Sequence, residues 1–117
     1  MLGIGAATRV FLAAGATDMR KGFDGLFGLV RDRLQADPCS GHVYGFSNRQ
    51  RTRLKLLYWD GSGLWVCAKR LERGRFRWPE AGAAASIGLS GAELALLLDG
   101  MDVSGARRRG WYRREPG

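Results

Sequence analysis

The chain has 117 residues, of which 45% are hydrophobic and 26% are charged, so it is long enough for one domain with one modest core. No apolar run reaches the roughly 18 residues that a membrane span needs, and no positively charged segment precedes a long apolar run at the start, so we expect a cytoplasmic protein with no membrane partner. The net charge of +8 favours nucleic acid as the partner, ahead of a membrane surface.

The positive charge is concentrated in two stretches. Residues 42–78 hold nine basic and two acidic side chains, and residues 105–117 hold five basic and one acidic side chain. Residues 79–104 carry four acidic side chains and no basic ones. The position of the charge therefore directs attention to the central block and to the end of the chain.

The first half of the chain predicts a strand and then a helix. Residues 8–13 are rich in β-forming side chains and end before Gly15, which indicates a strand. Between about residues 18 and 35 the apolar side chains recur at intervals of three and four, which is the helical period, with Thr17 or Asp18 as the N-cap. Three glycines, at positions 22, 25 and 28, fall on one stripe of this helix. We interpret the stripe as close packing of the helix backbone on a sheet, with a partner surface as the alternative.

The second half predicts a sheet, a short helix and a basic tail. Strands are expected at 42–46, 54–59, 64–69 and 75–78, with a hairpin turn at Asp60–Gly63. After a flexible stretch at 81–85, Ser90 and Glu93 have the spacing of a capping box that opens a helix ending near Gly100. The fold class is therefore α+β: an antiparallel β-meander packed against one main helix, with a short C-terminal helix. We expect residues 1–104 to form this single domain and residues 105–117 to be a disordered basic tail.

Cysteine and histidine offer little chemistry here. Cys39 and Cys67 have neither the spacing nor the number for a structural zinc site, and the single histidine, His42, does not complete one. We expect two free, partly buried thiols, with a disulfide between them as the alternative. No metal and no cofactor is predicted.

An arginine-rich surface is the main functional prediction. Arg49, Arg51 and Arg53 alternate with other residues, so their guanidinium groups share one face if the segment is extended. Arginine suits bidentate contact with phosphate and with the edge of guanine. The plain alternative is a solvated strand face. The predicted nucleic-acid-binding residues are Asn48, Arg49, Arg51, Arg53, Lys55, Arg70, Arg73, Arg75 and Arg77, with Arg107, Arg108 and Arg109 in the tail as a second contact.

Aromatic side chains are interleaved with these arginines. Tyr58, Trp59, Trp65, Phe76 and Trp78 are the residues concerned. Some of them are able to stack on unpaired bases, but a domain this small needs most of its large side chains for burial, so we expect core positions.

No catalytic residues emerge from the sequence. A metal-dependent nuclease needs two or three converging carboxylates, whereas the acids near the basic block, Asp60 and Glu72, both fall in predicted turns. No phosphate-binding loop, nucleophile elbow or Cys/His dyad at a recognisable spacing is present. We therefore predict that the protein is not an enzyme.

Four ordered blocks of sequence resemble a known family. They are residues 17–26, 37–41, 48–61 and 69–79, and the likeness extends from about residue 8 to about residue 103. The amino-acid sequences of these blocks resemble those of the TnpB accessory proteins of the insertion sequence 66 family of transposable elements. These proteins are unrelated to the RNA-guided nuclease of the same name. Gln50, where the family usually has arginine, and Gly45, where bulkier residues are usual, depart from the pattern.

The resemblance implies a small protein that assists a separate transposase, with no catalytic residue to carry over. Two functions fit it: DNA binding through the arginine-rich surface, or a protein adaptor that docks the transposase through the glycine-faced helix and exposed aromatic side chains. A cryptic nuclease is the third and weakest hypothesis.

Overall fold

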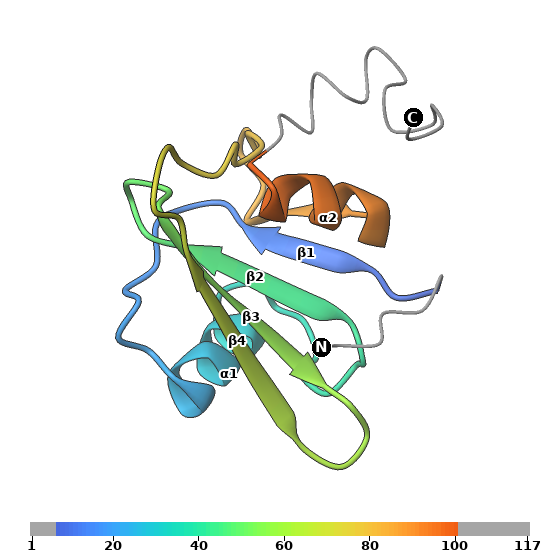
Figure 1. Cartoon of the computed structure of the whole chain (residues 1–117). Helices are drawn as coiled ribbons and strands as arrows, with labels where there is room; N and C mark the ends of the chain where they lie inside the picture. The colour runs from blue at the N-terminus through green and yellow to red at the C-terminus, as the bar shows by residue number, and fades with distance from the viewer. Residues whose placement is uncertain (1–6, 101–117) are drawn as a thin grey trace.

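A computed structural model describes residues 7–100, which form a five-stranded mixed sheet with one helix on each face (Figure 1). The elements in chain order are β1 (Val10–Ala13), α1 (Phe23–Asp32), β2 (Val43–Ser47), β3 (Arg53–Trp59), β4 (Leu64–Arg70), β5 (Ser86–Leu89) and α2 (Gly91–Leu98). The predicted α+β class is confirmed. The predicted tail and Arg107–Arg109 lie outside the described residues. No helix within residues 7–100 is long and apolar enough to cross a membrane.

The sheet has the order β4-β3-β2-β1-β5, and its pairings are of both kinds. β3 pairs antiparallel with both β2 and β4, while β1 pairs parallel with β2 and antiparallel with β5. Parallel neighbours need a crossover connection, and α1 supplies it between β1 and β2. The sheet is therefore mixed rather than wholly antiparallel as predicted.

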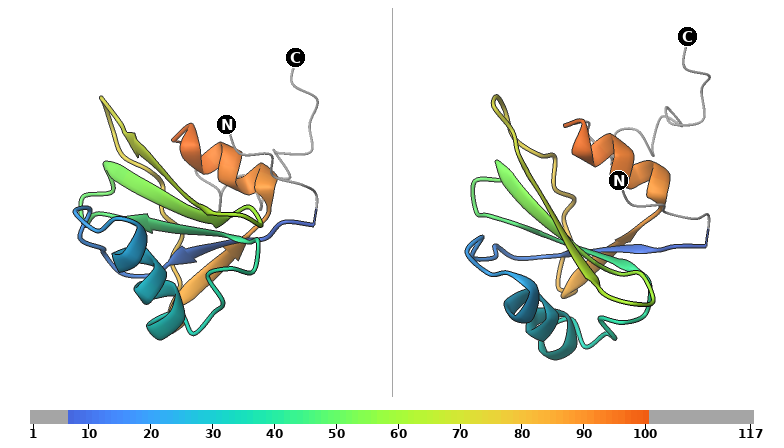
Figure 2. Two further views of the ribbon diagram at one scale, coloured as in Figure 1. Left: turned by 90° about the horizontal axis from the view of Figure 1, so that it is seen from below. Right: turned by 60° about the horizontal axis from the view of Figure 1, so that its bottom comes forward.

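Strand alternation gives the protein two apolar clusters, one on each face of the sheet. On one face Leu54 and Leu56 pack with Leu94 and Leu97 of α2. On the other face Leu57 belongs to the cluster that holds the buried residues of α1, Leu26 and Val30. Figure 2 shows α1 and α2 on opposite sides of the sheet. Burying each leucine contributes roughly 1.5–3 kcal/mol, so both helices are held mainly by these apolar faces.

The main helix is shorter than predicted, and it begins at a different residue. α1 starts after Gly22, which caps it without any side-chain hydrogen bond, so neither Thr17 nor Asp18 is the N-cap. The Asp18 carboxylate instead binds the Arg20 guanidinium at 2.7 Å, within a turn in which Lys21 N donates to Asp18 O. At the other end Gln35 adopts φ +53°, outside the helix.

The glycine stripe of α1 does not pack closely on the sheet. A side chain at Gly22 would meet nothing within 4 Å, and one at Gly28 would meet only the Arg31 guanidinium. At Gly25 the nearest atoms belong to Lys21. The predicted close approach of helix and sheet is therefore wrong, because Leu26 and Val30 form the face that is buried.

Residues 75–78 are not a fourth strand of the meander. The segment after β4 is held by Phe76 N donating to Arg51 O at 2.6 Å and by the side chain of Phe76, which is 1% exposed. Its aromatic side chains join the α2-side core, so packing rather than a ladder of hydrogen bonds fixes it. The strand that does complete the sheet, β5, was not predicted, because its Ser-Ile-Gly-Leu sequence has weak β propensity.

Two local predictions are confirmed in detail. The capping box exists: Ser90 Oγ accepts from Glu93 N at 3.1 Å, and Glu93 Oε1 accepts from Ser90 N at 2.8 Å. The β3–β4 turn forms at Asp60–Gly63, with Asp60 N donating to Gly63 O and Gly61 at φ +103°. In both places the structure depends on residues close together in sequence, and tertiary contacts do not change it.

Candidate nucleic-acid interface

The arginines predicted to bind nucleic acid gather at one end of the sheet. The turn between β2 and β3 (residues 48–52) and the segment that follows β4 (residues 71–80) meet there, because Leu71 N donates to Thr52 O and Phe76 N donates to Arg51 O. In Figure 1 both lie at the left, away from the β3–β4 hairpin. We call this region, residues 48–53 and 69–80, the arginine end.

The 48–52 segment is a tight turn, not an extended strand. Asn48 Oδ1 accepts from Thr52 N at 2.9 Å and from Arg53 N at 3.1 Å, and Asn48 Nδ2 donates to Thr52 Oγ1. Arg51 adopts φ +59°, the left-handed conformation. The predicted row of three guanidinium groups on one face therefore does not form, since it depended on extended backbone. Asn48 holds the turn with its own side chain.

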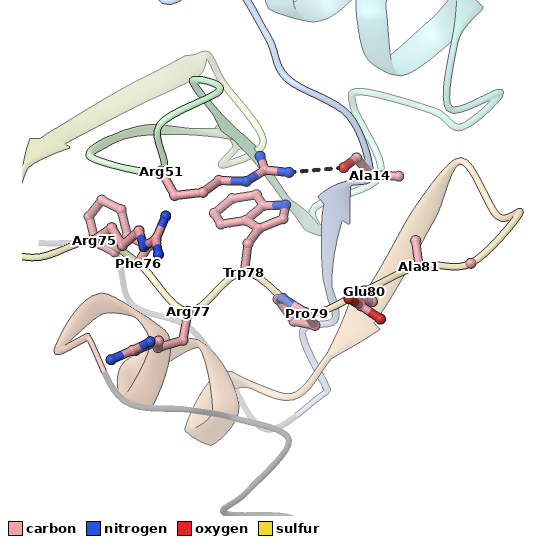
Figure 3. Close-up of a pocket in the computed structure, with 10 residues that line it drawn as sticks. Ala14, Arg51, Arg75, Phe76, Arg77, Trp78, Pro79, Glu80 and Ala81 are labelled. Carbon is pink, nitrogen blue, oxygen red and sulfur yellow. Dashed lines mark hydrogen bonds between the residues drawn. The ribbon is translucent and has the colours of Figure 1, made fainter.

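Arg51 turns inward, whereas its neighbours point to solvent. Its Nη2 atom donates to Ala14 O at 3.2 Å, and its guanidinium carbon lies 5.1 Å from the ring centre of Trp78 (Figure 3). The Trp78 indole in turn donates to Ala13 O at 2.9 Å. Burial lowers the pKa of the Arg51 guanidinium. Arg51 thus joins three segments of chain and serves the structure of the arginine end.

Trp78 also lies close to a buried glycine of β2, Gly45. A side-chain carbon at Gly45 would stand 2.6 Å from Leu12 Cδ2 and 3.3 Å from Leu56 Cδ2, with Trp78 at 3.9 Å. The absence of a side chain at this buried position makes room for the neighbouring core groups.

Five exposed arginines of the arginine end have no carboxylate partner among residues 7–100. Within residues 7–100 the ion pairs are Asp18–Arg20, Arg31–Asp32 and Arg70–Glu72, the last at 3.5 Å between exposed side chains. The exposed arginines of the arginine end that lie outside these described pairs are Arg49, Arg53, Arg73, Arg75 and Arg77. Their positive charge is therefore not neutralised by described carboxylates nearby.

Two cavities open at the arginine end, on different faces of the sheet. One, of about 730 Å³, is lined by the Arg51–Trp78 stack together with Arg75 and Arg77 (Figure 3). The other, of about 320 Å³, is lined by residues of β3 and β4, among them Arg53, Lys55 and Arg70. The structure thus brings eight of the nine predicted binding residues outside the tail to one end, and Lys55 lies on the adjoining part of β3.

The aromatic side chains divide between core and surface. Phe76 is buried and Trp78, Tyr58 and Trp59 are partly buried, in line with the predicted core positions. Trp65 is 51% exposed, and its indole nitrogen donates to Asp60 Oδ2 at 2.7 Å in the β3–β4 hairpin. The contact between Trp78 and Arg51 was not predicted, because the two residues are 27 positions apart in sequence and meet only in the fold.

The remaining candidate groups are structural or isolated. His42 Nδ1 accepts from Arg9 N at 3.0 Å. Cys39 and Cys67 are both free, as predicted, although Cys39 is exposed rather than partly buried. The part of the chain that the structure describes contains no group of three or more His, Cys, Asp or Glu residues placed to hold a metal ion.

Comparison with known proteins identifies relatives along nearly the whole chain. The family model described as IS66 Orf2 like protein matches residues 8–108. The chain is 43% identical over 102 residues to the uncharacterized protein y4hO of Sinorhizobium fredii, covering 87% of this chain and 88% of that protein. It is 36% identical over 109 residues to y4jC of the same organism, covering 93% and 92%. No solved structure matches the chain.

Proposed function

Because the chain belongs to the IS66 Orf2-like family, we propose that it is an accessory protein of transposition that binds DNA through its arginine end and assists a separate transposase. The family is one of accessory proteins, and we propose no enzymatic activity for this member. The observation that carries the proposal is the gathering of five exposed arginines, without described carboxylate partners, from two separate segments of chain.

The charge distribution supports a polyanion as the ligand. Arg49 lies in the β2–β3 turn, Arg75 and Arg77 line one cavity and Arg53 lines the other, so positive groups stand on both faces of one end. Like charges held together destabilise the free protein unless a ligand or salt neutralises them. Phosphates of a duplex, spaced along an extended rod, match such an arrangement better than a small anion does.

The hydrogen-bonded turn at residues 48–52 favours a specific contact with DNA over a purely electrostatic attraction. Asn48 fixes the backbone on which Arg49 and Gln50 are exposed at the tip. Arginine and glutamine are side chains that make bidentate contacts with guanine and adenine in the major groove. The tip therefore suits contact with base edges, while the flanking arginines suit phosphates.

The test is a salt series with purified protein and three probes: element-end duplex, random duplex and single strand. If about five arginines neutralise phosphates, log K falls with log salt at a slope of about −4.5, roughly a 500-fold loss between 50 and 200 mM. The double variant Arg49→Ala/Arg73→Ala is expected to flatten the slope by about 1.8. Arg9→Ala/Arg31→Ala, which removes the same charge outside the arginine end, is the matched control and keeps the slope.

The second candidate function is a protein adaptor for the transposase, and one observation favours it. Phe23, the first residue of α1, is 52% exposed beside the unpacked glycines of that helix. An exposed aromatic side chain of this kind is typical of a docking contact. Absence of duplex binding at 50 mM salt contradicts the DNA proposal and leaves the adaptor, whereas equal slopes for the two double variants contradict the arginine end as the surface that binds DNA.

A further inference from the structure

Two arginines face each other across the β3–β4 pair. In the antiparallel register Arg53 stands opposite Arg70, and Lys55 stands opposite Ala68. Directly opposed side chains on an antiparallel pair have Cβ atoms roughly 5 Å apart, so two guanidinium groups share a small space here. Both arginines are exposed, and together with Lys55 and Lys69 they line the cavity of about 320 Å³. The Lys69 ammonium is engaged elsewhere, because it donates to Leu98 O at 2.7 Å.

The Lys55 ammonium at this cavity is held in place by the fold. Alternation along β3 places Lys55 on the same face as Arg53, the face that also carries Leu57 and the α1 cluster. Lys55 Nζ donates to Lys21 O at 2.8 Å, which ties the ammonium to the turn before α1. Met19, 8% exposed, contributes an apolar wall. The ammonium thus stands at a defined position beside the two guanidinium groups.

The negative charge at the cavity is smaller than the positive charge. Glu72 is the one acidic residue among the described residues that line it, and it reaches Arg70 only at 3.5 Å with both side chains mostly exposed. Like charges directly opposite each other on paired strands are destabilising. A group that carries one or two negative charges and several acceptor oxygens removes that repulsion and accepts from all three side chains.

We propose that Arg53, Lys55 and Arg70 form a site for a single phosphate group, filled by a backbone phosphate of the bound duplex. This inference rests on the proposed DNA-binding function for the source of the phosphate, whereas the site itself depends only on the three cations. Arg51 is not part of this site, because its guanidinium contacts Ala14 and Trp78 on another part of the arginine end.

The first arm of the test uses inorganic phosphate as the probe. Thermal unfolding is measured in sodium phosphate and in sodium chloride of equal ionic strength for the wild type, for Arg53→Gln/Arg70→Gln and for the charge-matched control Arg73→Gln/Arg77→Gln. Because a ligand that binds only the folded state raises the melting temperature, we expect wild type and control to rise more in phosphate than Arg53→Gln/Arg70→Gln does. In low chloride Arg53→Gln/Arg70→Gln is expected to melt at the same temperature as the wild type or higher, because the repulsion between the two guanidinium groups is removed. An equal rise in phosphate for all three proteins overturns the site.

The second arm uses duplex DNA over a salt series. Arg53→Gln/Arg70→Gln is expected to flatten the slope of log K against log salt by about 1.8. If the wild type binds no duplex while the phosphate-specific rise persists, the DNA function fails and the phosphate site stands. If the duplex slope is unchanged in Arg53→Gln/Arg70→Gln but flattened in the control, DNA binding stands and the proposed site is wrong.

Discussion

Arg51 shows how a single residue in a basic cluster serves the fold. It combines a left-handed backbone, a hydrogen bond to Ala14 O and a stack on Trp78, while its neighbours Arg49 and Arg53 are exposed. One of its nitrogens, Nη1, is buried without a hydrogen-bond partner within the described part of the chain. A side chain so placed is poorly available to a phosphate. At this end Arg51 therefore supports the fold, whereas the exposed arginines form the basic surface.

Replacement of Arg51 by alanine is therefore expected to destabilise the protein. The substitution removes a charged hydrogen bond and a cation–π contact, which together contribute about 2 kcal/mol to the free energy of unfolding. Arg49→Ala, on the exposed tip of the same turn, is expected to change that free energy by less than about 0.5 kcal/mol. Urea unfolding of the two variants makes the comparison. Equal stability of Arg51→Ala and Arg49→Ala contradicts a structural role for Arg51.

Among the elements, the β3–β4 hairpin depends on one carboxylate. Asp60 Oδ1 accepts from Ser62 N at 2.9 Å and from Gly63 N at 3.0 Å, and Oδ2 accepts from the Trp65 indole. The Ser62 amide is the largest influence, and together with Trp65 and Gly63 it lowers the pKa of Asp60 to about 2. The charged carboxylate is thus the form that the hairpin binds.

The acid stability of the protein is expected to reflect this group. Because the pKa of Asp60 is lower in the folded than in the unfolded state, its contribution is present above about pH 4 and is lost as the pH falls towards 2. The difference in free energy of unfolding between wild type and Asp60→Asn should therefore shrink over that interval. Unfolding curves between pH 5 and 2 measure it, and NMR titration of the carboxyl carbon reports the midpoint directly. A midpoint near the ordinary value of 3.8 contradicts the hairpin role.

At this scale the sequence predicted elements whose signals are local. The capping box of Ser90 and Glu93 and the hairpin turn at Asp60 depend on residues within three positions of each other, and both form as expected. The predicted start of α1 was wrong because aspartate is a common N-cap residue, whereas the Asp18 carboxylate binds the Arg20 guanidinium instead. β5 was missed because its strand character comes from pairing with β1, a partner more than seventy positions earlier.

The candidate site was predicted by composition but not by shape. The sequence placed most of the excess charge in residues 42–78, and the structure gathers eight of the predicted residues at one end. The alternation of Arg49, Arg51 and Arg53 suggested one face, whereas Asn48 closes the segment into a turn. The facing of Arg53 and Arg70 depends on strand register, which composition does not specify.

Considered as a whole, the protein has two dissimilar ends. β1 and β2 run parallel towards the arginine end, so the loop that leads into β2 lies at the other end, together with the β3–β4 hairpin. Cys39 belongs to that loop and is exposed. A partner bound by the arginine end should therefore leave Cys39 accessible.

Thiol labelling is expected to separate the two ends. A bulky maleimide on Cys39 should leave the affinity for duplex DNA within about twofold, since the rates of association and dissociation depend on groups at the interface. The matched control is Cys39→Ser/Gln50→Cys, which moves the label to the exposed tip of the arginine end and should abolish binding. Loss of binding with the label on Cys39 contradicts this orientation, and full binding with the label at position 50 excludes the tip from the interface.

The Arg51–Trp78 stack has an optical consequence. Trp78 lies half-buried beneath a guanidinium at the arginine end, whereas the half-exposed indole of Trp65 donates to Asp60 in the hairpin at the other end. Indole emission responds to solvent exposure and to nearby charge, so the two tryptophans are intrinsic fluorophores in different surroundings. The chain also contains Trp59 and Trp111, so in the double variant Trp59→Phe/Trp111→Phe each end of the sheet would carry one tryptophan as its own spectroscopic reporter. Quenching by an ion that reaches only one of them would then indicate which end a partner has covered.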